Sequence, residues 1–142
     1  MQNRKVSATE AARNFSDLIG QVRYQAASFD VVKGKVGADL ADAMWAHPND
    51  TTKFADVAPT GVKVSRGMTL DGLGKYLSQI VEKAEGPTDD VAGILRDREV
   101  DVVVNYLPVG SEDATRWYAE HVMASGCAMV NCMPVFIARE DY

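Results

Sequence analysis

The chain has 142 residues, the length of one domain, and its 46% apolar and 25% charged residues are ordinary for a soluble globular protein. No apolar run approaches the ~20 residues of a membrane span, and the start "MQNRKVSATEAARNF" lacks the apolar region of a secretory signal, so we expect a cytoplasmic protein. The net charge of −5 argues against nucleic acid, although residues 1–27 carry four basic against two acidic side chains.

The first segment predicts a strand followed by a helix. Ser7-Ala8-Thr9-Glu10 is a capping box, in which the serine accepts from an amide three residues on and the glutamate reaches back. We expect a helix from about Ala8 to Tyr24 and a short strand before it at Arg4–Ser7. The apolar residues of this helix form one stripe: Ala11, Phe15, Leu18, Ile19 and Val22.

From residue 28 onward, strand-like and helix-like segments alternate. The expected strands are Ser28–Val32, Gly61–Gly67, Val100–Leu107 and Ala128–Met133. The expected helices are Val36–Trp45, one capped by Thr69 that carries Leu70, Leu73, Leu77, Ile80 and Val81, one started by Thr88 with Asp89 and Asp90 in its first turn, and one capped by Ser111 and closed by Gly126. Val100–Leu107 is nearly all apolar, as expected of a strand buried on both faces.

This order predicts an α/β fold with a mostly parallel, Rossmann-like sheet in three layers, with helices on both faces. Residues 1–27 are expected to form one part and residues 28–142 the other. In such sheets, ligands bind beyond the carboxyl ends of the strands.

Three strand ends are candidate ligand sites. Asp30 could accept from the ribose hydroxyls of an adenosine or cap the following turn, and on this residue alone the cap is favoured. The turn of Leu107, Pro108, Val109, Gly110 and Ser111 leads into a helix whose free amides suit a flat or anionic cofactor, and a simple connection is equally open. Asn131 flanks a third turn.

The remaining reactive residue types favour structural roles. Neither His47 nor His121 has a nucleophile beside it, so each is expected to be solvated or packed. Cys127 and Cys132 lack further zinc ligands and are expected to be buried thiols. Trp117 is expected to pack. No catalytic or metal-ligating residue is predicted.

Together these stretches resemble the NAD-binding part of prokaryotic myo-inositol-1-phosphate synthase, also called inositol-3-phosphate synthase. The matching stretches begin at about Phe29 and are "FDV", "KVGADLADA", "FADVAPTGVKVSRGMTLDGLGKY", "VDVVVNYLPVGSE", "WYAE" and "VNCMPVFIA". The resemblance implies an isomerase that converts glucose 6-phosphate to an inositol monophosphate with bound NAD, in inositol and phospholipid biosynthesis. It implies NAD contacts at Asp30, Asp39, Tyr118 and along Leu107–Ser111.

The chain departs from that family in two ways. The domain that binds sugar phosphate, with its lysines, follows "VFIAREDY" in the family, and the glycine-rich turn after the first strand is replaced. In its place, "RKVSATEAARNFSDLIGQVRYQAASFDVV" resembles the N-terminal part of Phd/YefM-type antitoxins, whose helix helps form a dimer that binds operator DNA. In "VSATEA", side chains stand where a pyrophosphate should approach the backbone. The sequence is therefore typical of a chimera joined at a shared "FDVV".

Three functions remain open from the sequence. The first is an inositol-3-phosphate synthase-like fragment that is inactive alone and binds NAD weakly or not at all. The second is an antitoxin-like DNA-binding regulator of a toxin–antitoxin system, and the third is a non-functional fusion product. Homo-oligomerisation stays open, nucleic acid and membrane partners are not expected, and the sequence does not decide which strand occupies the centre of the sheet.

Overall fold

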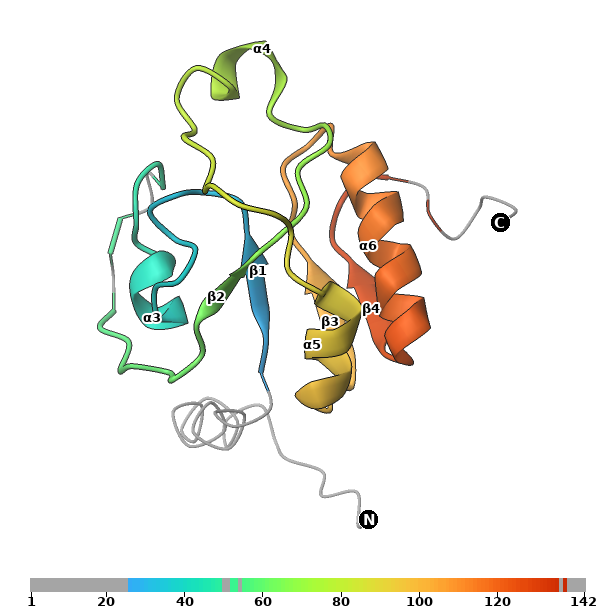
Figure 1. Cartoon of the computed structure of the whole chain (residues 1–142). Helices are drawn as coiled ribbons and strands as arrows, with labels where there is room; N and C mark the ends of the chain where they lie inside the picture. Colours follow the sequence, from blue (N-terminus) through green and yellow to red (C-terminus); the bar gives the residue numbers. More distant parts are fainter. Residues whose placement is uncertain (1–25, 50–51, 54, 136, 138–142) are drawn as a thin grey trace, which may run out of the picture.

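The computed structural model describes residues 26–49, 52–53, 55–135 and 137. The expected strand Arg4–Ser7 and helix Ala8–Tyr24 lie outside the described residues. The elements of the described part are β1 (Ser28–Asp30), α3 (Leu40–Ala43), β2 (Val64–Arg66), α4 (Gly74–Leu77), α5 (Val91–Asp97), β3 (Val102–Asn105), α6 (Glu112–Ser125) and β4 (Ala128–Asn131), all labelled in Figure 1.

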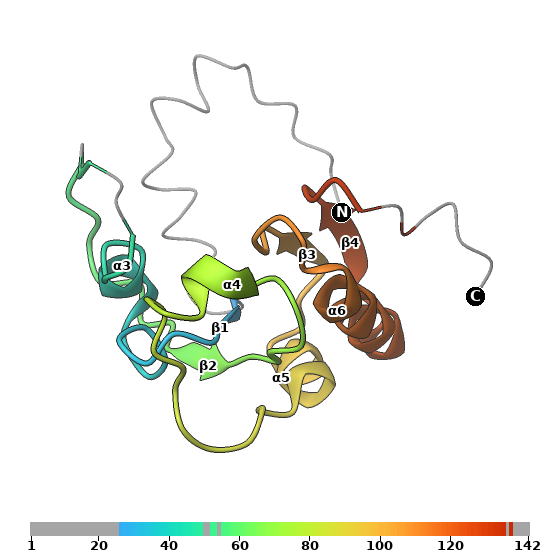
Figure 2. The same cartoon turned by 90° about the horizontal axis from the view of Figure 1, so that it is seen from above.

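The strands form two parallel pairs, which confirms the predicted parallel pairing. In one pair β1 lies beside β2, with Phe29 opposite Ser65. In the other, β3 lies beside β4, with Val103 opposite Met129. Figures 1 and 2 show β1 and β3 as the inner strands of the two pairs, with α5 and α6 on one face of β3 and β4.

One apolar core lies beneath α5 and α6. Its fully buried members are Val91 and Leu95 of α5 and Val122 of α6. Partly buried side chains from both strand pairs and from α6 pack against them: Ala27, Phe29, Val100, Val103, Trp117, Tyr118, Cys127 and Met129. The two strand pairs therefore share one helical cover, and the expected packing of Trp117 is confirmed.

The prediction that strand Val100–Leu107 is buried on both faces is wrong for the described part of the chain. Val103 packs against the helices, but Val102 and Val104 are 50% and 48% exposed. Side chains alternate between the faces of a strand, and the described residues cover only the face that carries α5 and α6.

The predicted helix from Thr69 to Val81 is also wrong, because only Gly74–Leu77 is helical. Gly72 has a φ of 86°, in the left-handed region, so a right-handed helix that starts at Thr69 cannot continue through it. The Thr69 hydroxyl is buried without a hydrogen-bond partner. Of the apolar residues that this helix was expected to carry, three are exposed: Leu70, Leu77 and Ile80.

The predicted helix Val36–Trp45 begins later, at Leu40. Gly37, at φ 85°, turns the chain so that the residues before the helix run along β2. Gly37 and Leu40 donate to the carbonyls of Val64 and Val62 at 2.8 and 2.9 Å. These sheet-like bonds occupy backbone groups that a longer helix would have needed.

Smaller differences concern helix starts and thiols. Helix α5 begins after Asp90, whose carboxylate accepts from the Gly93 amide at 2.9 Å, rather than at Thr88. Gly126 closes α6 at φ 81°, as predicted. The expected burial of both thiols is wrong, because Cys127 is only partly buried and Cys132, which lies past the end of β4, is exposed. None of the helices in the described part is long and apolar enough to cross a membrane.

Candidate functional site

Polar residues lie at the carboxyl ends of the strands, and some of them were predicted from the sequence as candidate site residues. Asp30 ends β1, Asn105 ends β3 and Asn131 ends β4, opposite Asn105. Gly67 follows β2 directly and donates to the Asp30 carbonyl at 2.8 Å. Because each pair is parallel, these ends meet at one edge of the fold.

Asp30 caps the turn that follows its strand, as the more conservative prediction had it. Its Oδ1 accepts from the amides of Val31 and Val32 at 2.7 and 3.0 Å. Its Oδ2 lies 3.4 Å from the ammonium of Lys35, and the Asp30 side chain is 30% exposed. One oxygen is thus committed to the backbone, and the other faces a cation and solvent.

Tyr118 supports the turn after β2 from below. Its hydroxyl accepts from the Met68 amide at 2.9 Å, and a Cβ on Gly67 would lie 2.2 Å from that oxygen. Only glycine therefore fits at position 67 with the tyrosine in place. Burial raises the pKa of Tyr118, which keeps the hydroxyl neutral. The ring also packs near Phe29, with centroids 6.5 Å apart.

A buried polar chain ties β3, β4 and α6 together. The Asn105 amide donates to Thr115 Oγ1 at 3.2 Å and to Asn131 Oδ1 at 3.0 Å, and its own oxygen accepts from the Leu107 amide at 3.0 Å. Thr115 donates to the Ser111 carbonyl at 2.6 Å. Asn131 holds the next turn by donating to the carbonyls of Met133 and Val135 at 3.3 and 3.0 Å.

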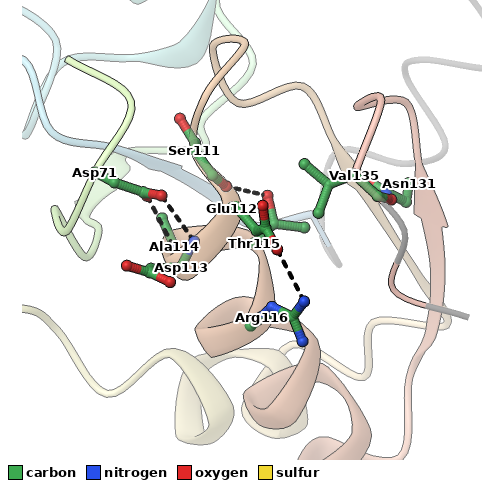
Figure 3. A network of polar contacts seen from close by, with 9 residues as sticks. All are labelled: Asp71, Ser111, Glu112, Asp113, Ala114, Thr115, Arg116, Asn131 and Val135. Atoms are coloured by element: carbon green, nitrogen blue, oxygen red, sulfur yellow. Dashed lines mark hydrogen bonds and ion pairs between the residues drawn. The ribbon is translucent and has the colours of Figure 1, made fainter. Parts of the chain in front are cut away.

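The amino end of α6 is closed by a carboxylate, and this corrects the prediction that Ser111 caps it. Ser111 is the residue before the helix, but its side chain makes no capping bond. Asp71 instead accepts from the amides of Asp113 and Ala114 at 2.8 and 3.0 Å, as Figure 3 shows. A Cβ on Gly72 would lie 1.8 Å from Ser111 Oγ, so the chain beside Asp71 packs directly on the helix start.

The electrostatics agree with this closure. Burial raises the pKa of Asp71, but the amides of Ala114 and Asp113 more than offset it and lower the pKa overall. Negative charge at this place is favoured by the helix dipole. A free anion would have to displace Asp71 to reach those amides, so α6 does not present the open amino end that the sequence suggested.

The turn before α6 is open to solvent. Val109 is 78% exposed, and Gly110 has φ 94° with nothing within 4 Å of a Cβ placed there. The Ser111 amide donates to the Pro108 carbonyl at 3.1 Å, which closes the turn. Leu107 to Gly110 therefore offer an accessible backbone at the strand edge, while Ser111 itself is buried.

Asp39 is not brought to this edge. It is the residue before α3, and its carboxylate accepts from the amides of Ala41, Thr60 and Gly61 at 2.9, 2.9 and 2.7 Å and from the Thr60 hydroxyl at 2.8 Å. Hydrogen bonds from Thr60 and Ala41 lower its pKa to about 2. Asp39 anchors the loop before β2, near the amino end of that strand.

The described residues contain no group of three or more His, Cys, Asp or Glu side chains placed to hold a metal. His121 stacks on Trp117 with ring centroids 3.7 Å apart and is therefore packed, which was one of the two expectations for it.

A cavity of about 340 Å³ lies away from the carboxyl ends of the strands. It is lined by Ala26, Ala27, Gly61, Val62, Lys63, Ser65, Ile94 and Arg98.

Sequence reasoning missed three residues of this site. Asn105 lies within the strand that was predicted to be buried and was therefore not named as a site residue. An asparagine that ends the apolar run "VVVN" before a turn could have indicated a polar role. Thr115 and Asp71 carried no local signal, because their partners are set by tertiary packing.

No protein-family model matches the chain, but individual proteins do. It is 52% identical over 114 residues to inositol-3-phosphate synthase of Mycobacterium tuberculosis, which is 80% of this chain and 31% of the relative. Inositol-3-phosphate synthase of Corynebacterium glutamicum is 48% identical over 122 residues, 86% of this chain and 33% of the relative. The crystal structure of Ari2 matches with a TM-score of 0.61 and 26% identity, over 80% of this chain and 31% of that one.

The chain thus spans about a third of the length of these curated relatives and matches them as a fragment. The similarity agrees with the resemblance seen in the sequence from about Phe29 onward.

Proposed function

We propose that this chain is a nucleotide-binding unit of the inositol-3-phosphate synthase type, with a three-layer Rossmann-like fold in its complete form. The observation that carries the proposal is the 52% identity over 114 residues to an enzyme of that name. The parallel strand pairs, with polar residues at their carboxyl ends, are what such a unit requires.

NAD, which the resemblance implies, fits this edge only in part. Asp30 carries a partly exposed carboxylate oxygen where a ribose hydroxyl could donate, and the open turn Leu107–Gly110 offers accessible backbone. The anionic part of the molecule fits poorly, because Asp71 already holds the amides at the start of α6. We therefore expect NAD affinity to be weak.

The 142-residue chain should not form inositol phosphate by itself. It matches only 31% of the M. tuberculosis relative. The test is incubation of the purified chain with glucose 6-phosphate and NAD, with product measured by mass spectrometry and the full-length M. tuberculosis enzyme as the positive control. Product formation by the 142-residue chain would overturn this expectation.

The antitoxin-like alternative rests on residues 1–34, most of which lie outside the described residues. None of the relatives named above is an antitoxin. With four basic residues in residues 1–27 and a net charge of −5, DNA binding should be weak and non-specific. A gel shift on one short operator that survives ~0.2 M salt, and fails on scrambled DNA, would favour the regulator instead.

A further inference from the structure

The inner strands of the two pairs have edges that no described strand occupies. The carbonyls of Asp101 and Asn105 accept from the amides of Ala128 and Cys132 at 2.9 and 3.1 Å, so these residues direct their backbone groups toward β4. The alternate residues Val102 and Val104 therefore direct their backbone groups away from β4. On β1, the Asp30 carbonyl accepts from Gly67 at 2.8 Å, so Phe29 directs its groups away from β2. We call the space between these edges the central slot.

Both edges of the central slot lie in one layer. Phe29 of β1 and Val103 of β3 pack against the same cluster of Val91, Leu95 and Val122. In Figures 1 and 2 the strands follow the order β2, β1, β3, β4. One further parallel strand in the slot would give the 3-2-1-4-5 order of a doubly wound sheet, in which the strand preceding β1 in sequence is central.

The slot suits a short strand. Beyond Asp30 the same edge of β1 is already taken, since Lys33 donates to the Glu82 carbonyl at 2.9 Å and Ala84 donates to the Val31 carbonyl at 2.8 Å. Only the level of Phe29 and the residues before it is free among the described residues. A strand of about four residues is therefore enough to pair with both edges.

We propose that Arg4–Ser7 of this chain is that strand, and that the helix predicted at residues 8–24 covers the open face. This rests on the doubly wound fold proposed above, and not on NAD binding or activity. The twenty residues between Ser7 and Ser28 exceed the 10–12 that a βαβ crossover needs. A segment tethered next to β1 also has a high effective concentration there.

The handedness of the connection predicts which face the helix covers. A chain that starts in the slot would continue to β1 and then β2 on one side of the slot. After β2 it crosses to β3 and then β4 on the opposite side of the slot. Right-handed crossovers then place residues 8–24 on the face opposite α5 and α6. That is the face on which Val102, Val104 and Val130 are half exposed, and the apolar stripe of residues 11–22 matches it.

Amide hydrogen exchange on the full chain, followed by NMR, tests this inference. The Val104 amide faces the slot and the Val103 amide faces β4, so the two are matched probes within one strand. In the unmodified chain both should be protected. Val6→Pro, which removes a donor and blocks the strand, should lower Val104 protection at least tenfold and leave Val103 within threefold. Gln2→Pro, outside the strand, should change neither.

A second measurement guards against a variant that unfolds. In the unmodified chain, Val6 backbone protons should show NOEs to those of both Phe29 and Val104. Fast exchange of Val104 in the unmodified chain, absence of these NOEs, or protection that rises with protein concentration, as a second copy would give, each overturns the proposal. A chain that shows the NOEs but binds no NAD would leave this inference intact and contradict only the cofactor proposal.

Discussion

At the scale of single residues, the strand ends are held by polar side chains that the fold has buried. Asn105 is 6% exposed and Thr115 is fully buried, and their side chains bond to each other, to Asn131 and to the Ser111 carbonyl. A buried polar group that is satisfied in this way is costly to change, because its partners are left without water. The geometry of the turn after β3 therefore depends on one amide.

Asn105→Ala should lower the free energy of unfolding by about 2–4 kcal/mol, because it removes three hydrogen bonds and leaves the Leu107 amide without a partner. The matched control is Asn49→Ala, whose side chain bonds to the Met44 carbonyl and to Lys35 at the exposed surface and should cost below about 1 kcal/mol. Urea unfolding measures both losses of free energy, provided that the dependence of the unfolding free energy on urea concentration is the same in each variant. Equal costs would show that the buried chain of bonds does not stabilise the fold.

Asp39 should make stability depend on pH in the acid range. Its folded pKa of about 2 lies below the ordinary 3.8, so its contribution is complete above about pH 4 and is lost as the pH falls towards 2. A carbon-13 NMR titration should place its midpoint near 2. Thr60→Ala removes the hydroxyl bond but keeps the amide, so the midpoint should rise only part of the way. A midpoint near 3.8 in the unmodified chain would contradict the geometry.

At the scale of elements, the sequence predicted the strands better than the helix starts. All four expected strands exist in the described part, because alternating and apolar runs are local signals. The helix expected from Thr69 fails because Gly72 takes a positive φ, and the start of α6 is set by Asp71, which lies 42 residues before Asp113. A cap supplied by a distant segment cannot be found from local spacing.

Asp71→Ala should destabilise the chain by about 1 kcal/mol, the usual cost of losing a helix cap. Ser111→Ala should cost less, because the Ser111 side chain makes no capping bond and the carbonyl that binds Thr115 remains. Urea unfolding gives the two costs, and amide exchange at Asp113 and Ala114 should accelerate in the first variant alone. The reverse order of costs would restore the serine cap that the sequence suggested.

At the scale of the whole molecule, the sequence indicated the parallel α/β class and the strand-end location of the site. It could not show that the two strand pairs share one helical cover while β1 and β3 are not paired with each other, because strand order is set by long-range packing. Nor could it show that Asp39 is used by a loop, or that the amino end of α6 is already closed. Of the residues for which the resemblance implies an NAD contact, Asp30 and the turn before Ser111 are the ones that lie exposed at the strand ends.

NAD affinity should then depend on the first turn of the chain. In the proposed arrangement, the turn after the central strand carries Ser7, Ala8 and Thr9 in place of the glycines that the resemblance implies, so side chains would keep the backbone from a pyrophosphate. Helix α6 cannot replace this contact while Asp71 accepts from its first amides. Losing two or three charge-assisted hydrogen bonds of ~1.5–3 kcal/mol each weakens binding by orders of magnitude. By calorimetry, the unmodified chain should bind NAD no tighter than about millimolar, and replacing Val6–Ala11 with a glycine-rich turn should restore measurable affinity.

In that repaired chain, Asp30→Asn should weaken NAD binding at least tenfold, because the ribose loses a charged acceptor while the amide oxygen can still hold the turn of Val31 and Val32. Asp89→Asn is the matched control, since Asp89 also accepts a backbone amide, that of Arg66 at 2.7 Å, beside the end of β2. It should leave the affinity within twofold. Micromolar binding by the unmodified chain would refute the role given to the glycines. A repaired chain that binds no better would contradict the cofactor proposal, whereas the strand proposed for Arg4–Ser7 is decided separately by the NOEs from Val6.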